Sequence, residues 1–387
     1  MNFEKNIQDI IPSMEKWRQK IHSKPEIAYE EFETSEFIAE KLKEFDIEVH
    51  KGIGGTGVVG VLKGNRKSNK AIGLRADMDA LPMSEKTNLK YSSKNPGKMH
   101  ACGHDGHVTM LLGAAYNLSR KKNFSGTVYL IFQPAEEGSK AGAKAMINDG
   151  LFDNFKMDSV WGIHNWPGLE LGKAVIHDEF AMAGGDLFEI NVIGKGGHAA
   201  QPQDSNDPVV AIGFIITALQ TILSRKIDPF SNAVLSITKV NAGTAFNVIP
   251  EKAYIGGTLR STNDKERNYL LKKIEEISKN TAISHNCETE FKITPGYPPT
   301  INDKHCAEQV RKIFKKTFGE HTVDMEHSAT MGSEDFSYML KKRPGAYVWL
   351  GCGEKSEKLH SPYYDFNDKL LPIGAKYWTN LVENLMP

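Results

Sequence analysis

Apolar runs alternate with amphipathic helical segments along most of this chain, and this alternation limits the possible folds more than any other feature. Strands are expected at 58–62, 72–74 and 128–132, with helices at 108–118 and 141–147. This order is typical of a mainly parallel or mixed sheet covered by helices on both faces. The sequence therefore predicts an α/β fold.

The octet HACGHDGH, residues 100–107, combines one cysteine, three histidines and an aspartate. In an extended segment, residues two apart point the same way, so Cys102 and His104 could offer sulfur and nitrogen to one ion or one ion pair. The alternative is a His-rich turn at the start of a helix, with His107 facing solvent. The octet alone leaves both interpretations open.

Other candidate ligands follow predicted strands. Asp77 comes shortly after 72–74, the pair Glu136 and Glu137 follows 128–132, and His164 follows an apolar run at 159–163. Ligands in α/β sheets gather beyond strand ends. Each residue alone is more often a loop acid or a hydrogen-bonded histidine, but their repetition indicates one shared site.

Between about residues 184 and 295 the pattern changes to a strand, a helix, two strands, a helix and a strand. This is the β-α-β-β-α-β order of a ferredoxin-like module. Asp207 and Asn263 are expected to cap its two helices. We therefore predict an inserted domain at 184–295, and a catalytic domain made of 1–183 and 296–387.

Composition narrows the partners and the compartment. The 387 residues include 48 basic and 48 acidic side chains, which gives no reason to expect nucleic acid or an anionic membrane as partner. The start of the chain is polar and charged, so neither a signal peptide nor a spanning helix is expected. Four cysteines without paired spacing fit a reducing compartment, which predicts a cytoplasmic protein.

Several motifs occur in a recognisable order: RADMDALP, MHACGHDGH, QPAEEG, GIHNWPG, GKGGHAAQPQDSNDP and LHSPYYDFND. Together they resemble the aminoacylase/hippurate hydrolase branch of the co-catalytic metallopeptidases, a family that includes carboxypeptidase G-type enzymes and auxin-conjugate hydrolases. The resemblance runs from Trp17 to the C-terminus. It implies a zinc-peptidase-like catalytic domain and a ferredoxin-like lid that also forms a homodimer interface.

The resemblance also implies two divalent metal ions per subunit, with ligands supplied by Cys102, His104, Glu137, His164 and His360. Glu136 would be the general base, and Asp77 would orient a ligand histidine. In an extended loop the side chains of neighbouring glutamates diverge, which would suit Glu136 and Glu137 to separate roles. In the wider superfamily an aspartate stands at position 102 and a ligand histidine at position 75. The thiolate of Cys102 is a softer ligand than a carboxylate. The identity of the metal therefore stays open among manganese, zinc, cobalt and nickel.

Residues in the predicted insert match the family's substrate contacts. The resemblance implies that His198 reaches the partner subunit's active site and stabilises the oxyanion, and that Asn247 and Arg260 bind the substrate carboxylate. Arg260 could instead form a surface ion pair. Glu334 would either orient a ligand or cap a helix.

The function predicted on this basis is metal-dependent hydrolysis of N-acyl-L-amino acids, with acetyl, benzoyl and indoleacetyl groups all open. A metallo-carboxypeptidase or dipeptidase is the nearest alternative. A thiol hydrolase with Cys102 as nucleophile would survive chelation, which separates it from the metal mechanism. A silent binding protein would be expected to have lost candidate ligands, and none is lost.

Overall fold

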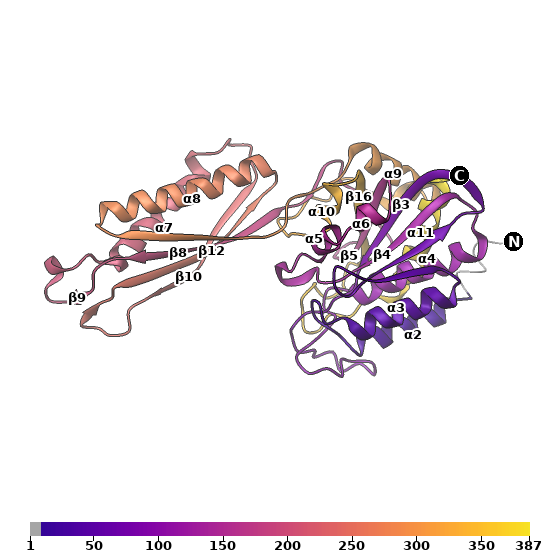
Figure 1. Cartoon of the computed structure of the whole chain (residues 1–387), viewed down its shortest axis with the longest axis horizontal. Coiled ribbons are helices and arrows are strands. Elements are labelled where there is room, and N and C mark those ends of the chain that lie inside the picture. The colour runs from indigo at the N-terminus through magenta and orange to yellow at the C-terminus, as the bar shows by residue number, and fades with distance from the viewer. Residues whose placement is uncertain (1–8) are drawn as a thin grey trace. The chain divides into compact units, whose positions relative to one another are not determined.

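The computed structural model describes residues 9–387, which form two compact units (Figure 1). The first unit holds the described residues up to Ala181, together with Ile301–Ser328 and Asp335–Pro387. The second holds Met182–Thr300 and Ala329–Glu334, so the short segment 329–334 groups with the insert and not with the predicted catalytic domain. The expectation that no signal peptide is present rests partly on residues 1–8, which lie outside the described residues.

An eight-stranded mixed sheet forms the centre of the first unit, in the order β1-β2-β4-β3-β5-β16-β6-β15. The four strands β4, β3, β5 and β16 are parallel neighbours. Their carboxyl ends therefore meet at one edge, which is where the sequence placed its candidate ligands. The strands are β1 Glu48–Ile53, β2 Gly57–Lys63, β3 Arg66–Asp77, β4 Ser125–Gln133, β5 Ser159–Pro167, β6 Ala174–Val175, β15 Val323–Asp324 and β16 Gly345–Gly353.

Helices pack against this sheet and share its hydrophobic core. Buried side chains of α2, α3, α4, α9 and α11 join those of the central strands in one cluster. The helices of this unit are α2 Ile11–His22, α3 Phe32–Glu44, α4 His104–Lys121, α5 Gly142–Asn148, α6 Leu151–Asn154, α9 Lys304–Phe318, α10 Ser337–Leu340 and α11 Leu371–Leu385. The predicted α/β class is confirmed: a large mixed sheet is covered by helices.

The second unit has the strand order β10-β12-β8-β13, with all neighbours antiparallel. Two helices pack on one face of this sheet (Figure 1). The order along the chain and across the sheet is that of a ferredoxin-like module. Its elements are β8 Gly184–Ile193, α7 Pro208–Arg225, β10 Ala233–Ala242, β12 Lys252–Ser261, α8 Asp264–Ser284 and β13 Glu288–Pro295. In addition, β9 Gly197–His198 pairs with β11 Val248–Ile249 in a two-stranded sheet. A separate two-stranded ribbon pairs β7 Phe180–Met182 with β14 Thr300–Ile301.

Both predicted caps of the insert are present. The Asp207 side chain accepts hydrogen bonds from the main-chain N–H groups of Val209 and Val210, and the Asn263 side chain accepts one from Glu266. Each cap satisfies amide groups that the first helical turn leaves without partners. The predicted starts of α7 and α8 are therefore close to the observed ones.

Among the described residues, α7 is the one helix long and apolar enough to cross a membrane by length and composition alone. A core helix of a soluble protein passes the same test. Ile212, Ile215 and Leu219 of α7 are buried in the core of the second unit.

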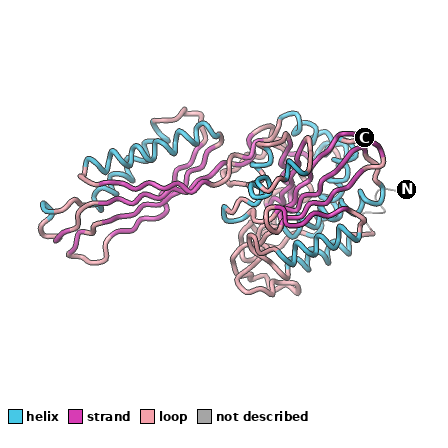
Figure 2. The backbone as a smooth tube through the Cα atoms, viewed as in Figure 1, coloured by secondary structure: helices cyan, strands magenta, loops and turns pink. Residues whose placement is uncertain are grey.

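Two loops of the first unit carry most of the candidate site. One connects β3 to α4 over residues 78–103 and is largely free of helix and strand (Figure 2). The other follows β4 and contains Glu136 and Glu137. Both start at the carboxyl ends of adjacent parallel strands, where Asp77 lies opposite Gln133.

Candidate metal centre

Helix α4 begins inside the His-rich octet, four residues earlier than the sequence predicted. Gly103 takes a left-handed conformation with φ 95°, and His104 is the first helical residue. A Cβ atom on Gly103 would lie 2.3 Å from Asn165 Oδ1 and 2.7 Å from the Tyr364 hydroxyl, so only glycine fits. The expectation that Cys102 and His104 lie on one extended segment is wrong: a tight turn separates them.

The two ring nitrogens of His104 have different surroundings. Its Nδ1 lies 2.9 Å from the main-chain oxygen of Asp79 and 3.2 Å from Asp79 Oδ1. A proton on Nδ1 leaves the lone pair of Nε2 free, as in most metal-binding histidines. Nε2 is buried and makes no hydrogen bond within the described residues. Its neighbour is a carboxylate, because Asp77 Oδ2 lies 3.5 Å away. A buried nitrogen that makes no hydrogen bond and faces a carboxylate suits a metal ion.

His164 and Cys102 lie together beside His104. His164 projects from β5, where its Nδ1 is 2.7 Å from the main-chain oxygen of Asn165 and its Nε2 is 3.4 Å from Cys102 Sγ. Burial and the neighbouring His107 lower the pKa of His164 well below its ordinary value. The imidazole is therefore neutral, as a metal ligand must be.

Glu136 and Glu137 occupy a tight turn and not the extended loop expected from sequence. Glu136 has helical dihedral angles, and Glu137 begins a short 3₁₀ turn. Glu137 Oε1 lies 3.2 Å from His360 Nε2, and the His360 side chain is about half exposed. The main-chain N–H of His360 donates to the Ala101 oxygen at 2.8 Å, which ties the C-terminal loop to the segment that carries Cys102.

Overlapping sets of ligand atoms connect all five predicted metal ligands. Cys102, Glu137 and His360 form one group whose ligand atoms lie within 4.8 Å of one another. His104 joins Glu137 in a second group with Glu136, and it joins His164 in a third with Asp77 and His107. The donor set of one sulfur, three imidazoles and a carboxylate therefore fits divalent metal ions.

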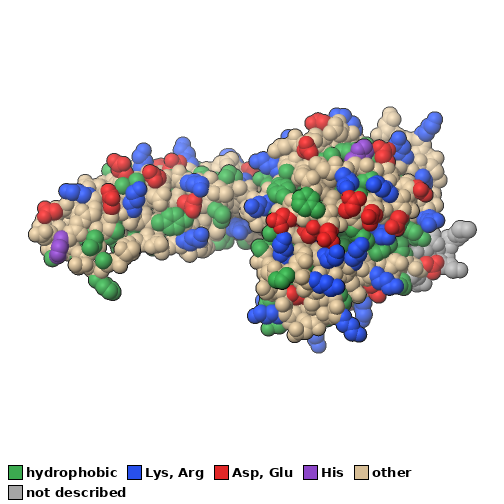
Figure 3. Space-filling view, turned by 60° about the horizontal axis from the view of Figure 1, so that its bottom comes forward, with side chains coloured by type: hydrophobic (Ala, Val, Ile, Leu, Met, Phe, Trp, Pro, Cys, Tyr) green, Lys and Arg blue, Asp and Glu red, His purple; other side chains and the backbone are tan. Residues whose placement is uncertain are grey.

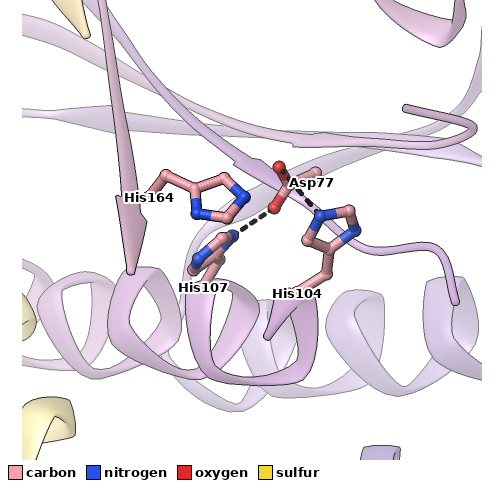
Figure 4. A group of neighbouring side chains, drawn as sticks. All are labelled: Asp77, His104, His107 and His164. Carbon is pink, nitrogen blue, oxygen red and sulfur yellow. Dashed lines mark hydrogen bonds and ion pairs between the residues drawn. The ribbon is translucent and has the colours of Figure 1, made fainter. Parts of the chain in front are cut away.

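Asp77 lies at the centre of the third group, and the rings of His104, His107 and His164 surround its carboxylate (Figure 4). Its oxygens contact His107 Nδ1 at 2.5 Å and the guanidinium of Arg75 at 2.8 Å. Burial alone would raise the pKa of Asp77, but the positive charges of His104, Arg75 and His107 lower it well below its usual range. Asp77 is therefore a carboxylate.

His107 was not predicted as a site residue, and the alternative interpretation, in which its ring faces solvent, is wrong. The side chain is fully buried between Asp77 and Asn165, whose Oδ1 lies 2.6 Å from His107 Nε2. Both ring nitrogens are thus engaged with protein groups. His107 therefore supports Asp77. Its place three residues after His104, which puts both side chains on one helix face, was the signal in the sequence that His107 belongs to the site.

Arg75 and Asp335 form a buried ion pair next to the site, and this pair was also not predicted from the sequence. The Arg75 guanidinium contacts Asp335 at 3.1 Å, and Asp335 accepts hydrogen bonds from Gln133 and from the main-chain N–H of Ala143, each at 2.8 Å. The charge of Arg75 balances two carboxylates, those of Asp77 and Asp335. Asp335 follows Glu334, whose predicted capping role is not observed: Phe336 precedes α10 and no side chain caps it.

Two groups of the site have pKa values set by their acidic surroundings. Burial raises the pKa of the Cys102 thiol well above its usual value, and Glu137, Glu136 and Asp77 add to this. Burial opposes a charge on His104, but Asp77, Asp79 and Glu137 raise its pKa to about 10. The acids therefore favour a positive charge at this point, which a metal ion can supply in place of a proton.

The three predicted substrate contacts lie in the second unit. His198 is exposed on β9, where it pairs with Val248 of β11, and the main-chain oxygen of the adjacent Asn247 accepts from Ala199 at 3.1 Å. Arg260 is half-buried on β12, and its guanidinium donates to Ser333 Oγ. His198 and Asn247 thus lie together at the small β9–β11 sheet, while Arg260 lies on a different strand.

The chain matches the model of the peptidase family M20/M25/M40 over residues 73–384. It is 45% identical over 382 residues to the hippurate hydrolase of Campylobacter jejuni, covering 98% of both chains. It is 42% identical over 375 residues to the IAA-amino acid hydrolase ILR1-like 2 of Arabidopsis thaliana, covering 95% of this chain and 84% of that one. The crystal structure of the Bacillus subtilis YXEP protein, described as a dinuclear metal binding peptidase, superposes with a TM-score of 0.86 at 32% identity, over 98% of this chain and 99% of that one. The chain therefore belongs to peptidase family M20/M25/M40, in the branch that contains hippurate hydrolase and the IAA-amino acid hydrolases.

Proposed function

We propose that this hydrolase cleaves the amide bond of N-acyl-L-amino acids, to give a carboxylate and a free amino acid, with bound divalent metal. The observation that carries the proposal is the buried Nε2 of His104, which makes no hydrogen bond among the described residues, while His104 shares a group of close ligand atoms with Glu136 and Glu137. The related hippurate hydrolase and IAA-amino acid hydrolase support the substrate class. The acyl group is then acetyl, benzoyl or a similar group.

In this proposal two divalent ions per subunit are held by Cys102, His104, Glu137, His164 and His360. When bound, the ions polarise the substrate carbonyl and lower the pKa of water. Manganese, zinc, cobalt and nickel all suit a mixed set of sulfur, nitrogen and oxygen donors. Asp77 keeps its role as the carboxylate that orients the ligands around it.

Glu136 moves the proton in this mechanism. It takes a proton from the attacking water, the water oxygen bonds to the carbonyl carbon, and the carbon–nitrogen bond breaks. Glu136 then gives the same proton to the departing amine nitrogen. Its side chain is buried with 7% of its surface exposed, which limits exchange of that proton with bulk solvent.

His198, Asn247 and Arg260 would bind the substrate. The proposal assigns His198 to the oxyanion that forms as the carbonyl carbon becomes tetrahedral, and Asn247 with Arg260 to the substrate carboxylate. The exposure of His198 on the short strand β9 supports a role toward another molecule.

A thiol hydrolase is a weaker proposal because of the surroundings of Cys102. A nucleophilic cysteine requires a lowered thiol pKa, whereas burial and nearby acids raise this one. The same thiol becomes a good ligand once a cation balances its charge.

We also propose a homodimer formed through the second unit. Phe214 on α7 is 57% exposed, its neighbours Val209 and Val210 are more than 40% exposed, and β10 is an edge strand with Val240 also exposed. Apolar side chains on a helix next to an unpaired strand edge favour association between copies.

The charges of the described residues suit a small-molecule partner, because Lys and Arg alternate with Asp and Glu over the face drawn in Figure 3. The free, buried cysteines fit a cytoplasmic location.

A metallo-carboxypeptidase or dipeptidase is the second candidate function, because the YXEP protein is described as a peptidase. A hydrolysis panel with metal-loaded protein separates the two. It should contain N-acetyl, N-benzoyl and N-indoleacetyl derivatives of several L-amino acids, their D-enantiomers, their methyl esters and unblocked dipeptides. The Glu136→Gln protein, prepared in the same way, serves as the control for contaminating activity.

We expect turnover of at least one N-acyl-L-amino acid series, and a raised KM for the methyl esters because the esters lack the carboxylate charge. A response at the level of the Glu136→Gln control for every acyl derivative, together with turnover of unblocked dipeptides, would favour the peptidase.

A further inference from the structure

Two buried carboxylates hold the main chain on either side of Glu136. The N–H of Ala135 donates to Glu31 Oε1 at 2.9 Å, and the N–H of Glu137 donates to Asp79 Oδ2 at 2.9 Å. Glu31 and Asp79 are at most 1% exposed. The residues immediately before and after Glu136 are therefore each tied to an acid from another segment.

The turn held in this way is a strained one. Ala135 has φ 53°, although it is not glycine, and Gly138, Ser139 and Ala141 also have positive φ. L-residues adopt this conformation only when the surrounding structure enforces it. The hydrogen bond from the Ala135 N–H to Glu31 is such a constraint, and it fixes the direction in which the chain delivers Glu136.

Asp79 also holds a second segment. Its main-chain oxygen and Oδ1 face the Nδ1 of His104, which leaves the Nε2 of that ring facing Asp77 Oδ2 at 3.5 Å. His104 also shares a group of close ligand atoms with Glu137. Asp79 is itself fixed, because Met78 donates to the Gln133 oxygen and Ala80 donates to the Glu26 oxygen. One residue thus sets the relative position of the start of α4 and the loop after β4.

Both carboxylate oxygens of Glu31 accept hydrogen bonds from protein groups, and Glu31 belongs to none of the groups of candidate metal ligands. Its Oε2 accepts from the Thr56 hydroxyl at 2.6 Å, and its Oε1 is used by Ala135. Glu31 precedes the first residue of α3 and belongs to the first unit, as does the turn it holds. It acts on the site through the main chain.

We propose that Glu31 and Asp79 form a carboxylate bracket that positions the site: Asp79 aligns the ligands His104 and Glu137, and Glu31 aligns the base Glu136. Both are positioning residues. The inference rests on the proposed function, in which His104 and Glu137 bind metal and Glu136 moves the proton. It predicts different effects for the two acids, because Asp79 touches ligands whereas Glu31 touches only the turn that carries the base.

The test uses the full-length variants Asp79→Ala, Glu31→Ala and Glu31→Gln. Asp303→Ala and Asp158→Ala are matched controls, because Asp303 accepts from the Cys306 N–H and Asp158 accepts from the Ala71 N–H, and neither acid belongs to a group of candidate ligands. Three quantities are measured for each protein: the dissociation constant of Co²⁺ from its absorption spectrum on titrating metal-free protein, kcat and KM at saturating Co²⁺, and the unfolding midpoint of the metal-free protein.

We expect Asp79→Ala to weaken Co²⁺ binding by about 10-fold to 100-fold, the range found when outer-shell partners of ligands are removed. Glu31→Ala should leave the Co²⁺ dissociation constant near the wild-type value and lower kcat with little change in KM. Glu31→Gln should recover most of this kcat, because an amide oxygen still accepts from Ala135. The controls should lower the unfolding midpoint without altering either function.

If Glu31→Ala does not fold, the double variant Glu31→Ala/Ala135→Gly takes its place, since glycine adopts positive φ without strain. We expect the double variant to bind Co²⁺ normally with a kcat below that of Ala135→Gly alone. Wild-type Co²⁺ affinity in Asp79→Ala, or equal losses in the controls, would overturn the bracket. The Co²⁺ titration needs no substrate, so this failure is distinct from a wrong substrate class or a wrong base.

Discussion

Replacing Glu136 by glutamine is expected to lower kcat by about two to four orders of magnitude while the protein keeps its metal. The amide has nearly the shape of the carboxylate, but it cannot take a proton from water or return one to the amine. Because Glu136 shares a group of close ligand atoms with His104 and Glu137, its pose in the variant should be little changed. The measurements are kcat at saturating metal and metal content by elemental analysis.

Glu137→Gln is the matched control, because it makes the same chemical change at the adjacent position. Its Oε1 faces His360 and lies with Cys102 in a candidate ligand group, so this variant should lose metal as well as turnover. Added metal should restore part of its activity but none of the activity of Glu136→Gln. The reverse pattern would show that the two roles are exchanged.

Mixing two inactive subunits should restore activity if His198 serves the partner's active site. His198→Ala removes an oxyanion donor, which is worth about two to three orders of magnitude in kcat. Glu136→Gln removes the base. In a mixed dimer, the site with intact Glu136 receives His198 from the other chain, so one of the two sites is whole. Random exchange gives about half mixed dimers, and roughly a quarter of wild-type sites, in a symmetric two-fold assembly.

Subunit exchange has to be verified by a tag on one chain before activity is compared. Gln203→Ala is a suitable control, because Gln203 is exposed a few residues from His198 and has no assigned role. The control should be active without any mixing. If tagged mixed dimers form and their activity equals the sum of the parents, His198 acts within its own subunit or not in catalysis.

The sequence predicted the elements of the site better than its local geometry. Apolar runs that end in acids at Asp77 and Glu136 mark parallel strands, because neighbouring parallel strands finish at one edge. The alternation of strands and helices is a long-range pattern, and small local errors do not alter it. The order of strands and helices in the insert was predicted for the same reason, and the caps Asp207 and Asn263 mark where its two helices begin.

The local errors share one physical cause. Gly103 and Ala135 have positive φ, and each turns the chain where an extended path was expected. At Gly103 the glycine itself is a signal for such a turn, but at Ala135 nothing in the local sequence is. Its conformation depends on Glu31, more than one hundred residues earlier in the chain. Tertiary contacts decide such positions.

The supporting residues were harder to predict than the ligands. His107, Arg75 and Asp335 are buried and charged or polar, and their roles depend on partners far apart in sequence. A motif identifies the residues that touch the reacting atoms. The acids and bases that hold those residues become visible only once the strands are assembled.

Metal dependence of amide hydrolysis is the central claim, and metal removal tests it most directly. The protein is stripped with a chelator, shown to be metal-free by elemental analysis, assayed on the best N-acyl-L-amino acid of the panel, and then reloaded separately with Mn²⁺, Zn²⁺, Co²⁺ and Ni²⁺. We predict that the metal-free protein turns over at the level of Glu136→Gln, and that at least one ion restores activity. Full turnover by protein verified to be metal-free would contradict the account.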